Sequence, residues 1–203
     1  MTRYFYDTEF LDDGSTIELI SIGIVCEDGR EYYAVNFDCD FRRICKDDWL
    51  WDNVVRHLPT TKTDWSDDAL QRGRGFHWLD DTAACVKPKW VIANEVREFI
   101  THPVAEGHAW QAGAPELWGY CAAYDHVALA QLWGPMKDMP VGIPFRTNDL
   151  AQLTASIPAF ERPVQDGALH NALADARWNY ALYCAAEAHI DLDRHIARTA
   201  PGE

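Results

Sequence analysis

The chain has 203 residues, and its composition, 48% hydrophobic and 25% charged, is ordinary for a globular protein. The net charge of −14 argues against extended electrostatic binding of duplex nucleic acid, which requires a basic surface. It leaves open a protein that binds only the end of a nucleic-acid strand in an acidic, metal-loaded pocket. No apolar run reaches the roughly 18–20 residues of a membrane helix, and the strand-like pattern starts too early for a signal peptide, so we expect a cytoplasmic protein without membrane contact.

The start of the chain predicts three strands followed by a helix. Residues 3–9, "IELISIGIVCEDG" and "EYYAVNF" have strand patterns, and the short turns between them imply an antiparallel meander. A helix is predicted over residues 46–58.

The stretch from about residue 60 to residue 90 mixes Gly, Pro, charge and Trp without a clean period. We interpret it as an insertion or excursion on a single domain that spans residues 1–203, rather than as a second domain. The segment "KWVIANEVREFI" that follows returns to a helical pattern.

The second half alternates strand and helix. A buried strand is predicted over residues 116–121, running into a helix that ends at Gly134. A short strand near Phe145 and a helix capped by the Asn of "NDLAQLTASI" follow. The Ala-rich "HNALADARWNYALYCAAEAHI" predicts a last amphipathic helix, and the whole order indicates an α/β domain with a mixed sheet.

The six cysteines include no CxxC pair, which suggests neither a disulfide framework nor a zinc knuckle. Cys26 and Cys121 lie inside apolar strand-like runs, and we expect both to be buried free thiols.

Two carboxylates stand at the end of the first predicted strand, in "RYFYDTEF". Strand side chains alternate, so Asp7 and Glu9 point the same way with α-carbons roughly 7 Å apart, while Thr8 faces away. Carboxylates so placed repel each other unless a proton or a cation lies between them, and Mg²⁺ takes such oxygen ligands. An isolated DxE is more often a solvated strand end.

Asp125 is the next candidate, in the first turn of a helix that begins where a buried strand ends, which is where sites form in open α/β sheets. The alternative is an Asp favoured there by the helix dipole. His126 points about 100° away and is expected to be peripheral.

The third segment is "LHNALADA". His170 and Asp175 converge if His170 precedes the helix and Asn171 caps it. A histidine there suits a general base for a water nucleophile, although alone it would be a helix-entry residue. Taken together, Asp7, Glu9, Asp125 and Asp175 are a ligand set for two divalent metals that promote phosphoryl displacement.

These segments resemble the motifs of the DEDDh-type 3′–5′ exonucleases of the ribonuclease H-like superfamily: "DTEF" the first, "AAYDHVAL" the second and "HNALADA" the third. Within this group the chain is most similar to bacterial ribonuclease AS, a polyadenylate-preferring exoribonuclease, on "RYFYDTEFLDDGSTIELISIGIVCEDGREYYAV" and "LWGYCAAYDHVALAQLWGPM". The resemblance implies a ribonuclease H-like fold with a mixed five-stranded sheet, an antiparallel meander and then parallel strands, flanked by helices.

The resemblance also implies roles for particular residues. Asp7, Glu9, Asp125 and Asp175 would hold two Mg²⁺ or Mn²⁺ ions, and His170 would deprotonate the attacking water. The backbone at Phe10 and Leu11 would seat the 3′-terminal nucleotide, and Glu18 is a candidate contact to its sugar or base, or simply an acid at a strand start. A homodimer acting on the 3′ end of single-stranded RNA is expected.

Cys121 departs from the pattern of many such enzymes, which carry Asn four residues before the second-motif Asp, and a substrate contact is in doubt there. Residues 60–90 match nothing in ribonuclease AS, which puts substrate specificity in doubt. The leading prediction is a metal-dependent 3′–5′ exoribonuclease that releases 5′-mononucleotides and favours adenylate ends. The alternatives are a DEDDh exonuclease acting on single-stranded DNA or short oligonucleotides, and a non-catalytic nucleic-acid-binding or assembly module.

Overall fold

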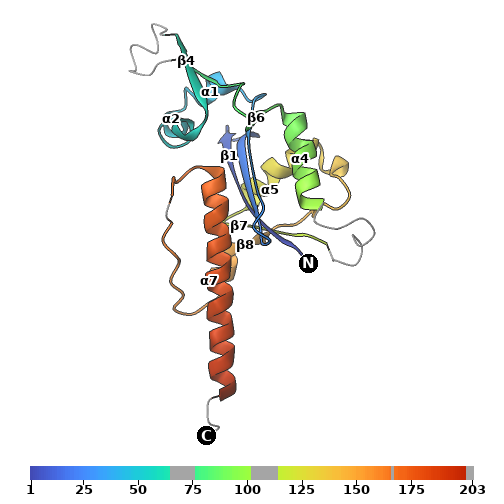
Figure 1. Cartoon of the computed structure of the whole chain (residues 1–203), viewed down its shortest axis with the longest axis vertical. Helices are drawn as coiled ribbons and strands as arrows, with labels where there is room; N and C mark the ends of the chain where they lie inside the picture. The colour runs from blue at the N-terminus through green and yellow to red at the C-terminus, as the bar shows by residue number, and fades with distance from the viewer. Residues whose placement is uncertain (65–75, 102–113, 166, 200–203) are drawn as a thin grey trace.

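The computed structural model describes residues 1–64, 76–101, 114–165 and 167–199 (Figure 1). The strands are β1 (Arg3–Asp12), β2 (Ile17–Cys26), β3 (Glu31–Asn36), β4 (Thr60–Asp64), β5 (Phe76–Leu79), β6 (Val86–Lys87), β7 (Glu116–Gly119) and β8 (Asn148–Asp149). The helices are α1 (Phe41–Ile44), α2 (Asp48–Asn53), α4 (Lys89–Thr101), α5 (Ala123–Ala130), α6 (Leu150–Ala155) and α7 (Ala172–Thr199), with short 3₁₀ turns η1 (Val55–His57), η2 (Gln131–Trp133) and η3 (Met136–Asp138).

The main sheet has six strands in the order β6-β3-β2-β1-β7-β8. Strands β1, β2 and β3 form the predicted antiparallel meander, and β7, β8 and β6 join parallel to their neighbours. The expected count of five strands is therefore wrong. The sixth is β6, a two-residue strand that exists because it pairs with β3, so no periodicity in the sequence could reveal it.

Two local predictions are also corrected. The strand expected near Phe145 forms at β8 instead, where it pairs with the end of β7. The cap of α6 is Asp149 rather than Asn148, since the Asp149 carboxylate accepts hydrogen bonds from the backbone N–H groups of Ala151 and Gln152. The described residues between 60 and 90 include β6 and a separate two-stranded sheet of β4 and β5. The interpretation of this stretch as an insertion stays a prediction.

The aromatic half of β1 lies at the centre of the fold. Tyr4, Phe5 and Tyr6 are fully buried. Tyr4 and Tyr6 pack in a core with α4 and α5, whereas Phe5 points to the other face and packs with Leu182 and Tyr183 of α7. Figure 1 shows the same arrangement, with α7 on one side of the sheet, α4 on the other, and the second half of α7 running on past the sheet. Among the described helices, none is both long and apolar enough to cross a bilayer.

The first turn of α7 lies directly on β2, at Gly23. A Cβ atom at this position would collide with the Ala172 carbonyl and with the Cα atom of Leu173. Further along α7 the buried side-chain amide of Asn179 donates a hydrogen bond to the Tyr6 carbonyl at 3.0 Å. Gly23 therefore sets how closely α7 approaches the sheet, and Asn179 helps to fix how it is rotated.

We expect Gly23→Ala to displace the start of α7 and to lower the free energy of unfolding by at least about 1–3 kcal/mol, the usual cost of overpacking. Chemical denaturation measures this. Gly167→Ala is the matched control, because its Cβ would meet Ala174 at an ordinary 3.6 Å. Equal stability of the two variants would contradict the close approach.

Candidate active site

A cleft of about 510 Å³ opens at the end of β1 that carries the carboxylates. It is lined by residues from β1, α2, α5, the loop before α7, and α7 itself. Every residue of the sequence-predicted catalytic set is among them: Asp7, Glu9, Asp125, His170 and Asp175. The structure thus gathers into one cleft five side chains that lie up to 168 positions apart, from Asp7 to Asp175.

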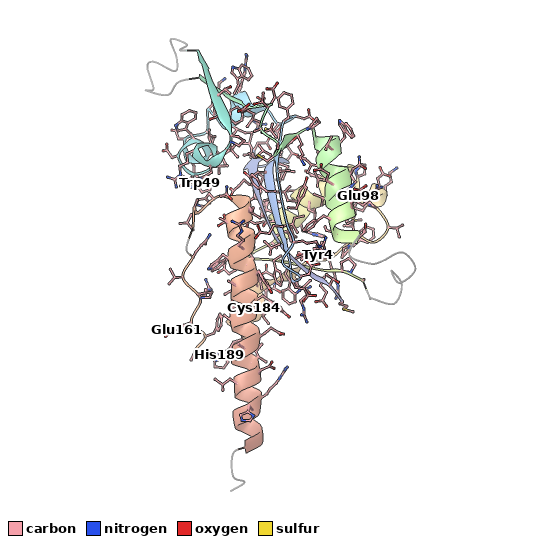
Figure 2. The ribbon with its side chains drawn as sticks, viewed as in Figure 1. Tyr4, Trp49, Glu98, Glu161, Cys184 and His189 are labelled. Atoms are coloured by element: carbon pink, nitrogen blue, oxygen red, sulfur yellow. The ribbon has the colours of Figure 1, made fainter. Side chains whose placement is uncertain are left out.

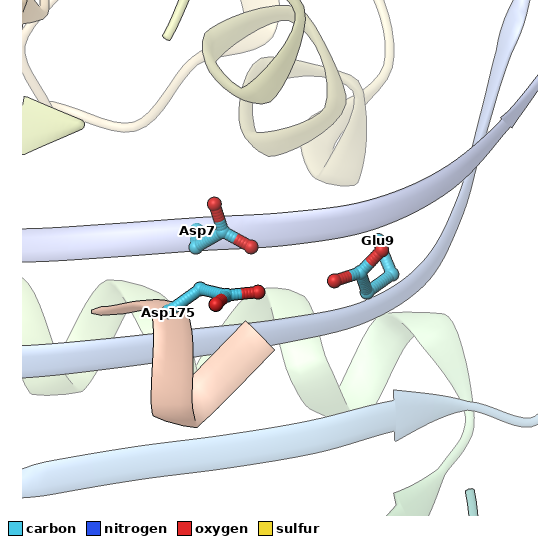
Figure 3. Close-up of side chains that lie close together, drawn as sticks. All are labelled: Asp7, Glu9 and Asp175. Atoms are coloured by element: carbon cyan, nitrogen blue, oxygen red, sulfur yellow. The ribbon is translucent and has the colours of Figure 1, made fainter. Parts of the chain in front are cut away.

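Three of the carboxylates form a tight cluster (Figure 3). One ligand oxygen from each of Asp7, Glu9 and Asp175 lies within 4.8 Å of the others. Asp7 and Glu9 share one face of β1, and Asp175 comes from the first turns of α7, which Gly23 allows to lie close by. The donor set is all carboxylate oxygen at a spacing that one or two hard divalent cations can bridge, so these residues fit such a metal.

Asp125 faces the same cleft but lies outside that cluster of three. It is in the first turn of α5, as predicted, and its Oδ1 accepts hydrogen bonds from the Thr8 backbone N–H at 2.9 Å and from the Thr8 hydroxyl at 2.6 Å. Thr8 points away from Asp7 and Glu9, as strand alternation predicts, and this orientation lets it hold Asp125. Both residues are buried.

The electrostatics of the cleft favour protons or cations. Burial, followed by the charges of Asp175 and Asp125, raises the pKa of Glu9 to about 8. The pKa of Asp7 is raised well above its ordinary value by burial and then by Asp125, Glu9 and Asp175. Burial also raises the pKa of Asp175, against a hydrogen bond from the Gln165 amide that lowers it. Glu9 therefore holds its proton into the neutral range unless positive charge enters, and the raised pKa values of Asp7 and Asp175 act in the same direction.

His170 lies immediately before α7, as predicted. Asn171 caps the helix, because its side-chain oxygen accepts a hydrogen bond from the Ala174 N–H at 3.1 Å. The His170 backbone has a φ of 63°, a left-handed conformation that costs a residue with a Cβ roughly 1–2 kcal/mol. Its ring packs edge to face against Trp49, with centroids 4.8 Å apart. The histidine is thus on a loop that lines the same cleft as the carboxylates.

The predicted substrate contacts are placed unequally. Phe10 lines the cleft, and its ring stacks on Tyr124 with centroids 6.0 Å apart. The Leu11 side chain is buried in the core beneath α2, and the contact expected from its backbone stays a prediction. Glu18 accepts a hydrogen bond from the Asp40 N–H at the start of α1 and is not part of the cleft lining.

Cys121 is exposed and lines the cleft, so the prediction of a buried thiol is wrong. The apolar run suggested a strand that continues through Cys121. In the structure β7 ends at Gly119, and Cys121 adopts a left-handed turn, with a φ of 54°, before α5. Cys26 is buried and free, as expected. His126 lies outside the cleft lining, with its Nε2 3.0 Å from the Phe145 carbonyl oxygen, which agrees with a peripheral position.

No motif in the sequence predicts a role at the site for Thr8, Trp49, Gln165 or Asn179. Thr8 and Gln165 bond predicted carboxylates, Trp49 contacts the predicted base and Asn179 ties α7 to β1. The only sequence signal was the place of Thr8 between two acids. The other three become visible only when distant segments meet.

An α/β sheet with a histidine and clustered acids in one cleft defines a candidate hydrolase, and comparison with known proteins makes the class specific. The model of the Rv2179c-like 3′–5′ exoribonuclease domain family matches residues 2–186. Two Mycobacterium tuberculosis proteins, named 3′-5′ exoribonuclease Rv2179c (strain ATCC 25618 / H37Rv) and 3′-5′ exoribonuclease MT2234.1 (strain CDC 1551 / Oshkosh), are each 40% identical over 196 residues, which cover 97% of this chain and 99% of each relative. The chain belongs to this family, and the prediction of a 3′–5′ exoribonuclease is confirmed at that level.

The raised pKa values predict how stability depends on pH. A carboxyl group whose pKa is raised in the folded state stabilises that state while protonated, and the contribution is lost as the pH rises from its ordinary 4.5 through about 8 for Glu9. In EDTA, the melting temperature should therefore fall between pH 6 and pH 9. Mg²⁺ or Mn²⁺ should restore it most strongly at the alkaline end.

Asp7→Asn removes one charge from the cluster and should reduce both the fall and the metal effect. Asp138→Asn, an exposed change on η3, is the control and should behave as the unsubstituted chain. A metal-free melting temperature that stays level or rises over this range would contradict the prediction.

Proposed function

We propose that this chain hydrolyses single-stranded RNA from the 3′ end to 5′-mononucleotides, with two Mg²⁺ or Mn²⁺ ions and His170 as the general base. The observation that supports this most is the cluster of Asp7, Glu9 and Asp175, whose oxygens lie within 4.8 Å of one another in a cleft that also contains Asp125 and His170. Crowded buried acids are unfavourable for folding alone, which supports a role in binding positive charge.

The metal ions, when bound, would neutralise the carboxylates and stabilise the charge on the phosphoryl oxygens during the displacement. Asp7, Glu9 and Asp175 are the residues that would hold them, with Asp125 completing the set from α5. Thr8 orients Asp125, and its two hydrogen bonds partly offset the effect of burial, which is the largest cause and leaves the pKa of that carboxyl raised. His170 would accept the proton of the attacking water.

The shape and charge of the protein suit binding of the end of a nucleic-acid strand. A net charge of −14 disfavours long contact with a polyanion, so binding energy must be concentrated at the cleft. Phe10 and Tyr124 offer aromatic surface there on which a base can stack. This combination supports removal of one terminal nucleotide at a time.

Several finer assignments belong to the same proposal. We assign the chain to the DEDDh branch with a ribonuclease H-like fold, and to the ribonuclease AS type with a preference for adenylate tails, on the motifs "DTEF", "AAYDHVAL" and "HNALADA". A cytoplasmic location and a homodimer are included. The complete set of acids and histidine in one cleft disfavours a non-catalytic module.

The activity test uses 5′-labelled poly(A), poly(U) and single-stranded DNA with Mg²⁺ or Mn²⁺. We expect stepwise shortening that EDTA abolishes and that a blocked 3′ end prevents. His170→Ala should reduce the rate by roughly 10²–10⁴-fold, the usual contribution of a general base. Asp175→Asn should lose metal-dependent activity, whereas Asp138→Asn should keep it.

Full activity of Asp175→Asn, or shortening from the 5′ end, would refute the proposed mechanism. Equal rates on RNA and DNA would favour the alternative of a general DEDDh exonuclease, and equal rates on poly(A) and poly(U) would remove the adenylate preference.

The homodimer is tested separately by light scattering on the purified chain. We expect a mass near twice the 23.1 kDa of one chain at micromolar concentration. A mass of one chain at all concentrations would refute the dimer without affecting the proposed chemistry.

A further inference from the structure

Two side chains of the α2–η1 segment, residues 48–57, contact the loop that carries His170. The indole ring of Trp49 meets the His170 ring edge to face, with centroids 4.8 Å apart and an angle of 74° between the planes. At the other end of the segment, His57 lies close enough to this loop for the Leu169 backbone to raise its pKa and for the His170 charge to lower it. Neighbouring residues of the loop are thus held from the same side.

The hydrogen bonds of His57 determine where its proton lies. The Arg56 Nε–H group donates to His57 Nε2 at 3.0 Å, so this nitrogen must be the unprotonated acceptor. The proton is therefore on Nδ1, which is the nitrogen that remains as a donor. Burial, then Arg56 and His170, lower the pKa of His57, which agrees with a neutral ring.

The segment is anchored independently of these two contacts. Leu50, Val54 and Val55 are buried in the core beneath α1 and α2. Trp49, by contrast, is 54% exposed, and Figure 2 shows it on the side of α2 that faces the start of α7. Its large apolar ring therefore lies mostly outside the core, and it contacts the His170 ring at the cleft.

The loop needs such support. His170 has a left-handed backbone, Leu169 is 52% exposed, and residues 167 and 168 are exposed as well. A strained conformation persists only where its surroundings determine it. Within the described part of the chain, the residues that interact with Leu169 and His170 include Asp175, Trp49 and His57.

We propose that Trp49 and His57 are positioning residues, which hold the Leu169–His170 loop so that the His170 ring faces the water beside the carboxylates. This inference rests on the proposed function, in which His170 is the general base. Trp49 acts on the ring and His57 on the backbone, so the α2–η1 segment sets the geometry of proton transfer without touching the reacting atoms.

The kinetic test compares Trp49→Ala and His57→Leu on oligo(A). A positioning residue should change kcat and leave KM nearly unaltered, so we expect kcat to fall roughly tenfold, less than for His170→Ala. Trp49→Phe and His57→Asn keep a ring and a donor respectively, and should recover most of kcat. Trp90→Ala is the matched control, because Trp90 is 68% exposed on α4, across the sheet.

A double-mutant cycle separates this role from base stacking. In a His170→Ala background, Trp49→Ala should cause no further loss, because the residue acts through His170. An undiminished effect in that background, or a higher KM with kcat unchanged, would overturn the proposal and make Trp49 a substrate-stacking residue.

A readout independent of activity separates failure of this inference from failure of the proposed function. The His170 ring resonances in the NMR spectrum of the metal-free protein should shift in Trp49→Ala and not in Trp90→Ala. Absence of the shift would refute the positioning contact. A shift combined with full activity of His170→Ala would refute the proposed general base and, with it, the catalytic meaning of the contact.

Discussion

The candidate site depends on one steric constraint, the close approach of α7 to β2 at Gly23. With no side chain there, the backbone at Ala172 and Leu173 lies against the sheet. This brings Asp175 beside Asp7 and Glu9, and it leaves His170 on a left-handed turn at the edge of the cleft. The hydrogen bond from Asn179 to Tyr6 holds the next turns in the same orientation. A helix one atom layer further out would leave the acids too far apart to share a cation.

The same approach concentrates negative charge where water is scarce. Glu9 and Asp7 hold their protons more tightly than usual, because burial and the neighbouring acids penalise ionisation. Such a cluster opposes folding, and the buried aromatic residues Tyr4, Phe5 and Tyr6 on the same strand offset it by packing on both faces of the sheet. Strand β1 thus combines a buried aromatic half with a half that carries crowded acids.

The acids and the histidine that sequence reasoning singled out line one cleft, because strand alternation and the helix start at Asn171 place them by local rules, while their catalytic roles stay a prediction. Sequence reasoning failed where the local structure depends on pairing between segments that are distant in the sequence. The two-residue strand β6 forms only against β3, Asp149 rather than Asn148 caps α6, and Cys121 is exposed because β7 ends two residues earlier. The interactions that suggest roles for Thr8, Trp49 and His57 involve residues distant in the sequence, so they are visible only in the tertiary structure.

The sequence by itself determined which side chains are candidates for the chemistry and on which elements they lie, since their positions follow from backbone periodicity and capping. Only the tertiary structure decided which of them meet. Asp7, Glu9 and Asp175 converge, Asp125 is held by Thr8 beside them, and the α2–η1 segment reaches His170. The physical reason is that local patterns constrain dihedral angles and faces, whereas distances between elements are set by packing, here by the space that Gly23 leaves for α7.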